Sequence, residues 1–325
     1  SMLPECPFLD LQPHRKSFGL IGICHCPSTP DIVEALQSME ERMEEAAQRK
    51  GATVWRCFAF DISDHQLTEL HSKRGKPSGV QHLVPIVPNR MLDNGHSLLT
   101  IQIQSALNNV CGDIFMSLEN SVASALDGTL QPPPRLQTAY DAKTMEKMKN
   151  KNRWTKRLEH RRKLWLASHA MLAGAPLNSA SWLESTISSM SVDKPRDAMW
   201  LGAVHEAMAA SIHLQNLDQA LSEMDNDDDF PGIMPPMGYV STACVPCDRD
   251  VVGHCVRAIA CYQSVGRDLW ELKVSAMLTL ARYYAQSMPP MKKEASRILR
   301  TLFETKEASN NSGGESVLFT ISSRA

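Results

Sequence analysis

Apolar and polar positions follow a helical period most clearly between Trp154 and His213, where the pattern predicts three consecutive amphipathic helices. Each of these helices has one apolar face, which would be left in water if the helix stood alone. We therefore expect the three helices to stack on one another and on the helices that follow them. The pattern is typical of a scaffold and carries no catalytic constellation.

The first helix of this stretch is expected to have one apolar face and one basic, solvated surface. The apolar face is expected to contain Leu158, Trp165, His169 and Leu172. The solvated surface is expected to contain Lys156, Arg157, Arg161 and Lys163. Gly174 provides a stop for this helix and Pro176 a start for the next one.

The second and third helices each carry an apolar stripe at spacings of three and four residues. The second stripe consists of Ala180, Leu183, Ile187 and Met190. Pro195 and Asp197 open the third helix. Its stripe consists of Trp200, Ala203, Val204, Ala207 and Ser211, and the small residues around it allow a neighbouring helix to approach closely.

The N-terminal part of the chain alternates between strand and helix patterns. Apolar runs predict strands at 17–26, 52–60 and 81–88, and helical periods predict a helix at 31–51 and one or two helices at 95–126. Between the second and third strands, 71–79 has the composition of a polar loop. The order of one strand, one helix, two strands and further helix predicts a small α/β domain.

The C-terminal part predicts a helix pair at 248–286 and a further helix that begins near 288. Trp165, Trp200 and Trp270 are spaced at 35 and 70 residues, close to one and two tetratricopeptide (TPR) repeats of about 34 residues. The predicted fold class is α/β plus α, with a TPR-like α-solenoid behind the α/β domain. The predicted domains are the α/β domain at 1–130, a proline linker at 131–139, the solenoid at 140–306 with a loop insertion at 222–247, and a flexible tail at 307–325.

Composition places few limits on function. The 325 residues allow two domains, the net charge is −2, and the nine cysteines have no regular spacing. A reducing compartment, and hence a cytoplasmic location, is the simpler expectation, since no apolar run is long enough to span a membrane and no signal segment is evident. Ser1 and Met2 resemble the remnant of a cleaved tag, which predicts a fragment of a longer protein.

Two groups of residues have side chains that could bind zinc. Cys244, Cys247, His254 and Cys255 are all zinc-binding types. The last two are adjacent in the sequence, so a helix would direct their side chains about 100° apart, and the alternative is that these are loop and core residues. Cys24, His25 and Cys26 alternate on a predicted strand, which would place the cysteines on one side and the histidine on the other.

Other motifs fail at decisive positions. Asp225, Asp227 and Asp229 match the opening of a calcium-binding loop, but Phe230 stands in place of its glycine and Pro236 in place of its closing glutamate. The segment 75–79 lacks the spacing of a phosphate-binding loop, and no glycine-rich dinucleotide motif or nucleophile elbow occurs. We therefore predict no catalytic residues and no cofactor.

The segment 143–163 contains ten Lys or Arg residues and two Glu residues, which makes it the most concentrated charge in the chain. Three interpretations remain open: a solvated helix face, a contact with an acidic protein or lipid headgroups, and a contact with nucleic acid, which lacks the expected aromatic residues. The candidate interaction residues are Arg153, Lys156, Arg157, Arg161, Arg162 and Lys163.

Four segments resemble one family in the same order along the chain. They are FLDLQPHRKSFGLIGI at 8–23, KRLEHRRKLWLASHAMLAGAPLNSASWLESTISSM at 156–190, AMWLGAVHEAMAASI at 198–212 and WELKVSAMLTLARYYA at 270–285. Together with the sequence between them they resemble the large TRAPP II-specific subunit of the transport protein particle, the family of the animal NIK- and IKK-beta-binding protein. The resemblance implies β-sandwich domains after the solenoid, which would follow Ala325 in a longer chain.

The resemblance implies a non-enzymatic scaffold or adaptor subunit of a complex that tethers vesicles and activates Rab GTPases at the Golgi. It implies a GTPase-like α/β domain without a nucleotide site. The implied partners are small longin-type and other TRAPP subunits, a Rab GTPase indirectly, and the Golgi membrane through a peripheral contact, with no nucleic acid. The alternatives are a generic TPR-like protein-binding module and a zinc-containing enzyme that uses the cluster from Cys244 to Cys255.

Overall fold

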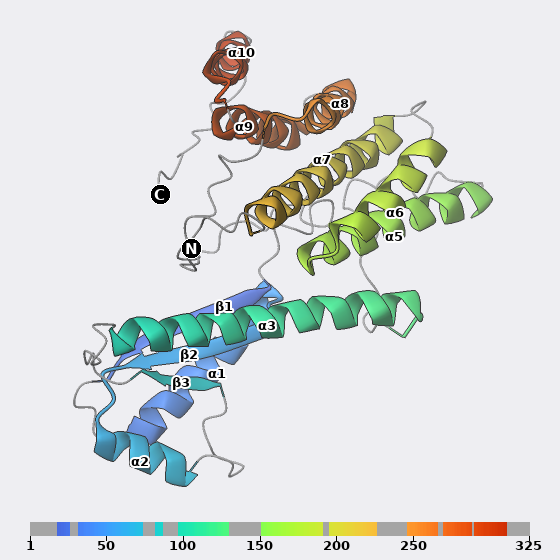
Figure 1. Ribbon diagram of the computed structural model, residues 1–325. Coiled ribbons are helices and arrows are strands. Elements are labelled where there is room, and N and C mark those ends of the chain that lie inside the picture. Colours follow the sequence, from blue (N-terminus) through green and yellow to red (C-terminus); the bar gives the residue numbers. More distant parts are fainter. Residues whose placement is uncertain are drawn as a thin grey trace. The chain divides into compact units, whose positions relative to one another are not determined.

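The computed structural model describes residues 18–26, 32–73, 82–86, 97–129, 151–190, 195–225, 246–265, 269–287 and 289–310. These residues form two compact units (Figure 1). The first, called the sheet unit, contains the described residues from Phe18 to Thr129. The second, called the helical unit, contains almost all of the described residues from Lys151 to Asn310. A small α/β part and a larger set of helices were both expected from the sequence.

The sheet unit contains three parallel strands in the order β1-β2-β3. The strands are β1 (Gly19–His25), β2 (Val54–Phe60) and β3 (Leu83–Ile86). Each lies inside a segment that the apolar runs predicted. Between and after the strands lie α1 (Ile32–Lys50), α2 (Asp64–Lys73) and α3 (Leu98–Leu126). The helix after β2 explains why β2 and β3 are parallel, because a parallel pair needs a crossover connection.

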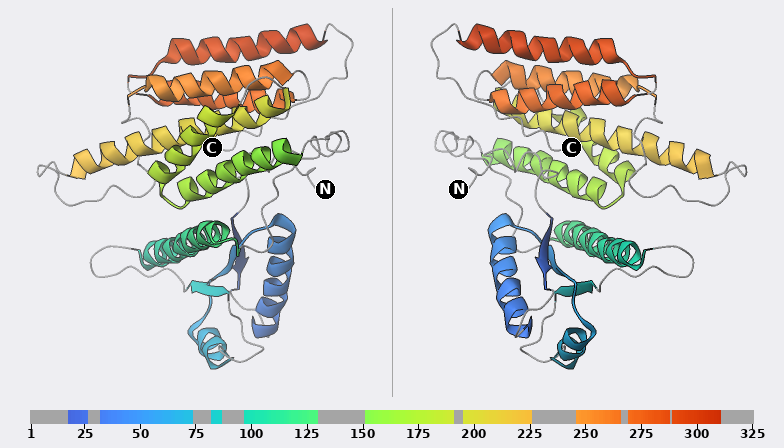
Figure 2. Two further views of the ribbon diagram at one scale, coloured as in Figure 1. Left: turned by 90° about the vertical axis from the view of Figure 1, so that its right-hand side faces the viewer. Right: turned by 90° about the vertical axis from the view of Figure 1, so that its left-hand side faces the viewer.

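The two faces of the sheet are covered by different helices (Figure 2). Cys57 and Ala59 of β2 pack with α1 and α2, whereas Val54 and Phe58 pack with α3, as the alternation of side chains along a strand requires. The Arg56 guanidinium forms an ion pair with the Asp113 carboxylate, which links β2 to α3. The sheet unit therefore has an apolar layer on each side of a short parallel sheet.

α2 was not predicted from the sequence. Its last residues, His71, Ser72 and Lys73, belong to the segment predicted as a polar loop, and that prediction is wrong for these three residues. The start of α2 is a capping box, because the Ser63 amide donates to Gln66 Oε1 at 2.9 Å and the Gln66 amide donates to Ser63 Oγ at 3.3 Å. The Ser-x-x-Gln spacing at 63–66 is a sequence signal for this helix.

The helical unit contains six described helices. They are α5 (Lys151–Leu172), α6 (Pro176–Ser189), α7 (Pro195–Asp225), α8 (Arg249–Val265), α9 (Trp270–Gln286) and α10 (Lys292–Asn310). Gly174 has a positive φ of 86° just after α5, which confirms it as a helix stop. Two predicted boundaries are wrong, because α7 continues into the predicted loop insertion and α10 continues into the predicted tail. The proline linker and 226–245 lie outside the described residues.

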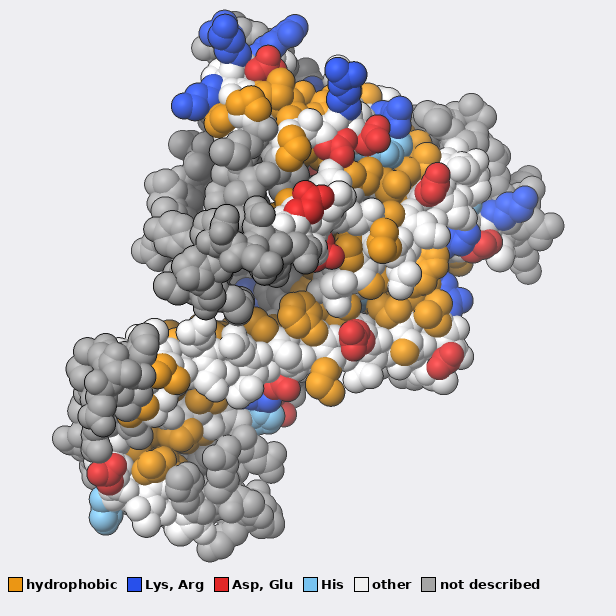
Figure 3. All heavy atoms as spheres, viewed as in Figure 1, with side chains coloured by type: hydrophobic (Ala, Val, Ile, Leu, Met, Phe, Trp, Pro, Cys, Tyr) orange, Lys and Arg blue, Asp and Glu red, His pale blue; other side chains and the backbone are white. Residues whose placement is uncertain are grey.

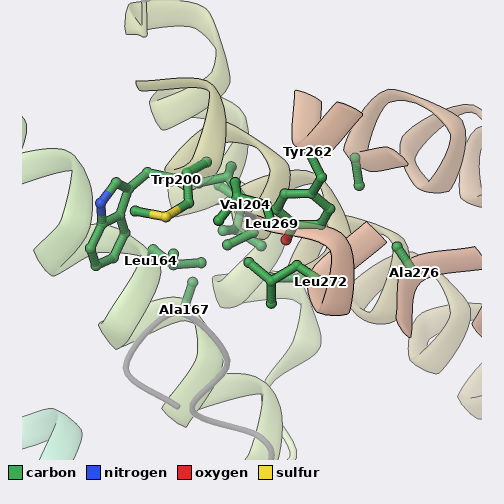
Figure 4. Close-up of a cluster of buried hydrophobic side chains, with 13 residues drawn as sticks. Leu164, Ala167, Trp200, Val204, Tyr262, Leu269, Leu272 and Ala276 are labelled. Carbon is green, nitrogen blue, oxygen red and sulfur yellow. The ribbon is translucent and has the colours of Figure 1, made fainter. Parts of the chain in front are cut away.

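The core of the helical unit brings together α5, α7, α8 and α9 (Figure 4). The predicted stripe of α7 is confirmed, since all five of its residues are buried. Around Trp200 and Val204 lie Leu164 of α5, Tyr262 of α8 and Leu272 of α9. The predicted stripe of α6 is confirmed at Leu183, which is fully buried. The amphipathic pattern thus locates the face that α7 buries.

α7 and α8 approach each other closely at Gly202. A Cβ atom added at Gly202 would lie 2.5 Å from Cε1 of Tyr262, so the aromatic ring occupies the space that any other side chain would need. Tyr262 is fully buried, and its hydroxyl donates to Glu206 Oε2 at 2.7 Å, one turn further along α7. The ring and the hydroxyl together fix how α8 lies on α7.

We predict that Gly202→Ala lowers the free energy of unfolding by about 1–3 kcal/mol, because the added methyl group overlaps the Tyr262 ring. Chemical denaturation of the purified chain measures this difference. Gly253→Ala in α8 is the control, since a Cβ there meets nothing within 4 Å and alanine favours a helix by about 0.5–1 kcal/mol over glycine. Equal stability of the wild type and Gly202→Ala would show that α7 and α8 can separate at no cost.

Candidate functional site

Among the described members of the predicted zinc cluster, His254 is separated from the two cysteines, Cys247 and Cys255, which belong to one apolar cluster. His254 Nδ1 lies 2.9 Å from His205 Nδ1 of α7, whereas Cys255 is buried in an apolar cluster with Val251 and Leu280. Burial raises the pKa of the Cys255 thiol to about 12, and burial also raises the pKa of Cys247. Cys244 lies outside the described residues. Within the described ranges, no three His, Cys, Asp or Glu side chains are placed to hold a metal ion.

Cys24 near the end of β1 and Cys26 just after it lie on one side of the chain, and His25 lies on the other side, as predicted. Cys24 Sγ lies 3.7 Å from Cys26 Sγ, and His25 Nε2 lies 2.7 Å from Asp61 Oδ2. Burial, followed by the neighbouring Cys26 thiol, raises the pKa of Cys24 to about 12, and burial raises that of Cys57 to about 11. At neutral pH Cys24 and Cys57 are therefore thiols, which are poor nucleophiles and poor metal ligands.

The other motifs yield no site that the structure describes. Asp225 is the last residue of α7, and Asp227 and Asp229 lie outside the described residues, as does 75–79. A hollow of about 430 Å³ follows one side of α3. It is lined by Asp113, Met116, Ser117, Asn120, Ser121 and Ser124. This lining contains no histidine or cysteine, and its one carboxylate, that of Asp113, forms an ion pair with Arg56.

The structure divides the six basic candidates on α5 into buried and exposed residues. Arg157 and Arg161 are only 8% and 3% exposed, so the prediction that they belong to the solvated surface is wrong. Lys156 and Arg162 are exposed, Lys163 is partly exposed, and Arg153 lies within α5. The predicted apolar face is also misplaced, because Leu158, Trp165 and Leu172 are only partly buried. His169 is buried as predicted.

The two buried arginines hold α5 against the start of α7. Arg157 Nη2 donates to Asp197 Oδ2 at 2.8 Å, and this carboxylate lies in the first turn of α7. The Arg161 guanidinium carbon lies 4.2 Å from the centre of the Trp200 ring, a cation–π geometry. A buried guanidinium is stable only when it is paired, so both side chains have a structural role here.

The exposed side of α5 carries those basic candidates that are not buried within the helical unit. We call Lys156, Glu159, Arg162 and Lys163 the α5 face. Lys163 Nζ donates to Ser185 Oγ of α6 at 3.1 Å and lies 3.7 Å from Glu159 Oε1. The α5 face has three basic residues and one acidic residue, and it is joined to α6 by this hydrogen bond.

A series of polar contacts joins α7 to α8 and α9. Besides the bond between Tyr262 and Glu206, Asn216 donates to Asp248 Oδ2 at 2.6 Å, and Tyr283 Oη accepts from the Asp248 amide at 2.8 Å. His213 meets the Tyr283 ring edge-on, with ring centres 5.2 Å apart. None of these pairs is predicted by the sequence, because each joins residues that are 32 to 70 positions apart and lack a local motif.

His205 and His254 form the most unusual of these contacts. The two Nδ1 atoms share one hydrogen bond. One ring must therefore be protonated at Nδ1 and donate, and the other ring must be unprotonated at Nδ1 and accept. Burial lowers the pKa of His205 to about 4, with smaller effects from His254 and Arg257. Burial also lowers the pKa of His254. Both rings are therefore neutral in the folded protein at neutral pH.

Comparison with known proteins finds two trafficking proteins. The chain is 26% identical over 218 residues, 66% of its length, to a "Trafficking protein particle complex II-specific subunit 120 homolog" of Arabidopsis thaliana. It is 26% identical over 174 residues, 53% of its length, to a protein of the same name from Oryza sativa subsp. japonica. The matched parts are 16% and 13% of those two proteins, so the chain corresponds to a small share of their length.

No family model matches the chain, and no solved structure matches it. None of the helices in the described part of the chain could span a membrane. The two matches support a distant relationship to TRAPP II-specific subunits.

We predict that Arg157→Met lowers the free energy of unfolding by about 3–5 kcal/mol, because the substitution leaves the Asp197 carboxylate without its partner in a nearly buried position. Lys163→Met on the same helix is the matched control and should cost less than about 1 kcal/mol, since its pair with Glu159 is solvated. Thermal and chemical denaturation provide the measurement. If both variants lost the same stability, Arg157 would not anchor α5.

We also predict that stability falls as the pH is lowered from about 6.5 to about 4, because the unfolded chain binds a proton at His205 that the folded chain excludes. The free energy of unfolding at several pH values measures this slope. His205→Asn should make the slope shallower, whereas His65→Gln, at an exposed position of α2, should leave it unchanged. A slope that persists fully in His205→Asn would contradict the assignment.

Proposed function

We propose that this chain is a non-enzymatic scaffold or adaptor subunit of a TRAPP II-like complex that tethers vesicles and promotes nucleotide exchange on a Rab GTPase in Golgi trafficking. The observation that carries this proposal is the 218-residue match to a TRAPP II-specific subunit homolog. The match extends over two thirds of the chain and therefore involves more than one local motif. The proposed location is the cytoplasm, at the periphery of Golgi membranes.

The architecture of the helical unit supports a scaffold role. From α6 to α10, each helix packs against the next one in the sequence. Stacking of sequence neighbours is the arrangement of an α-solenoid, which presents extended surfaces to other proteins. We therefore propose a TPR-like solenoid for this unit and a GTPase-like fold without a nucleotide site for the sheet unit.

The proposed partners are small longin-type and other TRAPP subunits, with a Rab GTPase and the membrane contacted through the assembly. The α5 face supports contact with an acidic protein surface, because it holds Lys156, Arg162 and Lys163 close together on one helix. Such rim charges mainly speed and orient association. Arg157 and Arg161 are left out of this contact because their side chains already bind within the helical unit.

Purification of the tagged protein from its native cells, followed by mass spectrometry, tests this proposal. We expect the small TRAPP subunits to be recovered in amounts comparable to the tagged chain. Recovery of unrelated proteins without any TRAPP subunit, from cells in which those subunits are present, would overturn the proposal and favour a generic TPR-like binding module.

A charge reversal tests the α5 face within the same experiment. We predict that Lys156→Glu, Arg162→Glu and Lys163→Glu together reduce recovery of the partner subunits about tenfold or more, by replacing attraction with repulsion at an acidic contact. The matched control reverses Lys292, Lys293 and Arg297, which are exposed on α10, where Lys and Arg side chains also gather (Figure 3). If the α5 variant recovered as much of the partner subunits as the α10 variant, the α5 face would be a solvated surface and not a binding surface.

A further inference from the structure

Among the described strands, the sheet ends at β3 on one side and at β1 on the other, and these two edges are protected to different degrees. At one edge, β3 is four residues long and contains Pro85, which lacks an amide hydrogen for strand pairing. At the other edge, β1 is seven residues long and its sequence, GLIGICH, contains no proline, lysine, arginine, aspartate or glutamate. Soluble proteins usually protect an open edge with these residues or cover it. The β1 edge therefore has the features of a strand that is paired in the assembled protein.

The side chains of β1 on the α3 side of the sheet are exposed although they are apolar. Ile21 is 40% exposed and Ile23 is 72% exposed. In the register of the sheet, Ile23 is paired with Phe58, whose side chain lies beneath α3. Parallel partners point to the same face, so both isoleucines belong to the face that α3 covers over β2 and β3.

α3 itself continues this apolar surface toward β1. A Cβ atom added at Gly19 would lie 2.7 Å from Cδ1 of Ile114, so Ile114 lies over the start of β1. Leu107 is two helical turns before Ile114 on the same side of α3, and its side chain is 39% exposed. The exposed isoleucines therefore have an apolar helix side next to them.

We propose that β1 pairs with β1 of a second copy of this chain, in antiparallel orientation about a two-fold axis at Gly22. Two-fold symmetry requires identical strands to pair antiparallel when they meet edge to edge. Centred on Gly22, this register places Ile21 opposite Ile23 of the partner subunit, and Ile23 opposite Ile21 of the partner subunit. The two pairs lie on the same face and form one apolar cluster of four isoleucines.

The second copy is favoured over an unrelated strand by the symmetry of the β1 sequence. The two exposed isoleucines flank a glycine, so the strand is complementary to itself. The register sets His25 opposite Gly19 of the partner subunit, and no like charges meet. The product is a continuous six-stranded sheet with both α3 helices on one face, and the four isoleucines lie between these helices.

The contact is small, since one strand pair and one apolar cluster bury less than the about 1,200–2,000 Å² of a standard interface. A reversible dimer with a dissociation constant in the micromolar range is therefore expected. The inference depends only on the sheet unit. It does not rest on the proposed trafficking function, and the two can fail separately.

Sedimentation velocity of the full chain from about 1 to about 100 µM tests the proposal, because mass action shifts a weak dimer over this range. The wild type should change from monomer to dimer. Ile21→Glu with Ile23→Glu should remain monomeric, since this variant sets glutamates opposite each other. Ile21→Lys with Ile23→Glu should still dimerise, because each introduced lysine then faces an introduced glutamate.

The control is Leu177→Glu on α6, a position that is also 72% exposed but lies in the helical unit, and this variant should dimerise like the wild type. Circular dichroism shows whether each variant is folded. Hydrogen exchange of the wild type gives a test without substitutions, since amides of 19–25 should exchange more slowly at the higher concentration.

Three outcomes would overturn the proposal. The first is a wild type that is monomeric at every concentration, with unchanged exchange in β1. The second is a dimer that persists in the double glutamate variant, which would place the interface elsewhere. The third is loss of the dimer in both double variants, which would exclude the antiparallel register even if the isoleucines contribute.

Discussion

The contact between Gly202 and Tyr262 is the constraint on which the helical unit depends most. An aromatic ring lies directly on the backbone of α7, so α8 reaches a separation that other residues at this position would prevent. The same ring contributes to the core formed with α5 and α9, and its hydroxyl is satisfied by Glu206. The Tyr262 side chain therefore fills part of the core, lies against the backbone of α7, and has its hydroxyl hydrogen-bonded. These three contacts together determine how the neighbouring helices α5, α8 and α9 lie on α7.

The pattern of apolar residues predicted those parts of the fold whose signal is local. The strands, the stripe of α7 and the stop at Gly174 each depend on a few neighbouring residues, and each was correct. The predicted end of α7 was wrong because the helical spacing of Leu217, Leu221 and Met224, which continues the apolar pattern, was not recognised. α2 was missed for a related reason, since its capping box was not recognised.

The candidate site was harder to predict because a charged side chain can be buried only where a neighbouring helix provides a group that pairs with it. The sequence shows that Arg157 and Arg161 are basic, and a basic residue on a helix is usually exposed. Only the start of α7 provides the carboxylate of Asp197 and the ring of Trp200 that make their burial favourable. The pair of His205 and His254 is similar, since neither residue belongs to a motif. Contacts of this kind join helices that are far apart in the sequence, so they can be identified only from the three-dimensional structure.

The distribution of thiols has a practical consequence for spectroscopy. Burial keeps Cys24, Cys57 and Cys255 protonated, so these thiols react slowly with electrophilic dyes near neutral pH. Cys111 is the exposed thiol among the described cysteines, and it lies near the middle of α3. Maleimide labelling under mild conditions would therefore direct a fluorophore preferentially to α3 among these residues. A reporter at that position would respond to anything that approaches the apolar side of the helix.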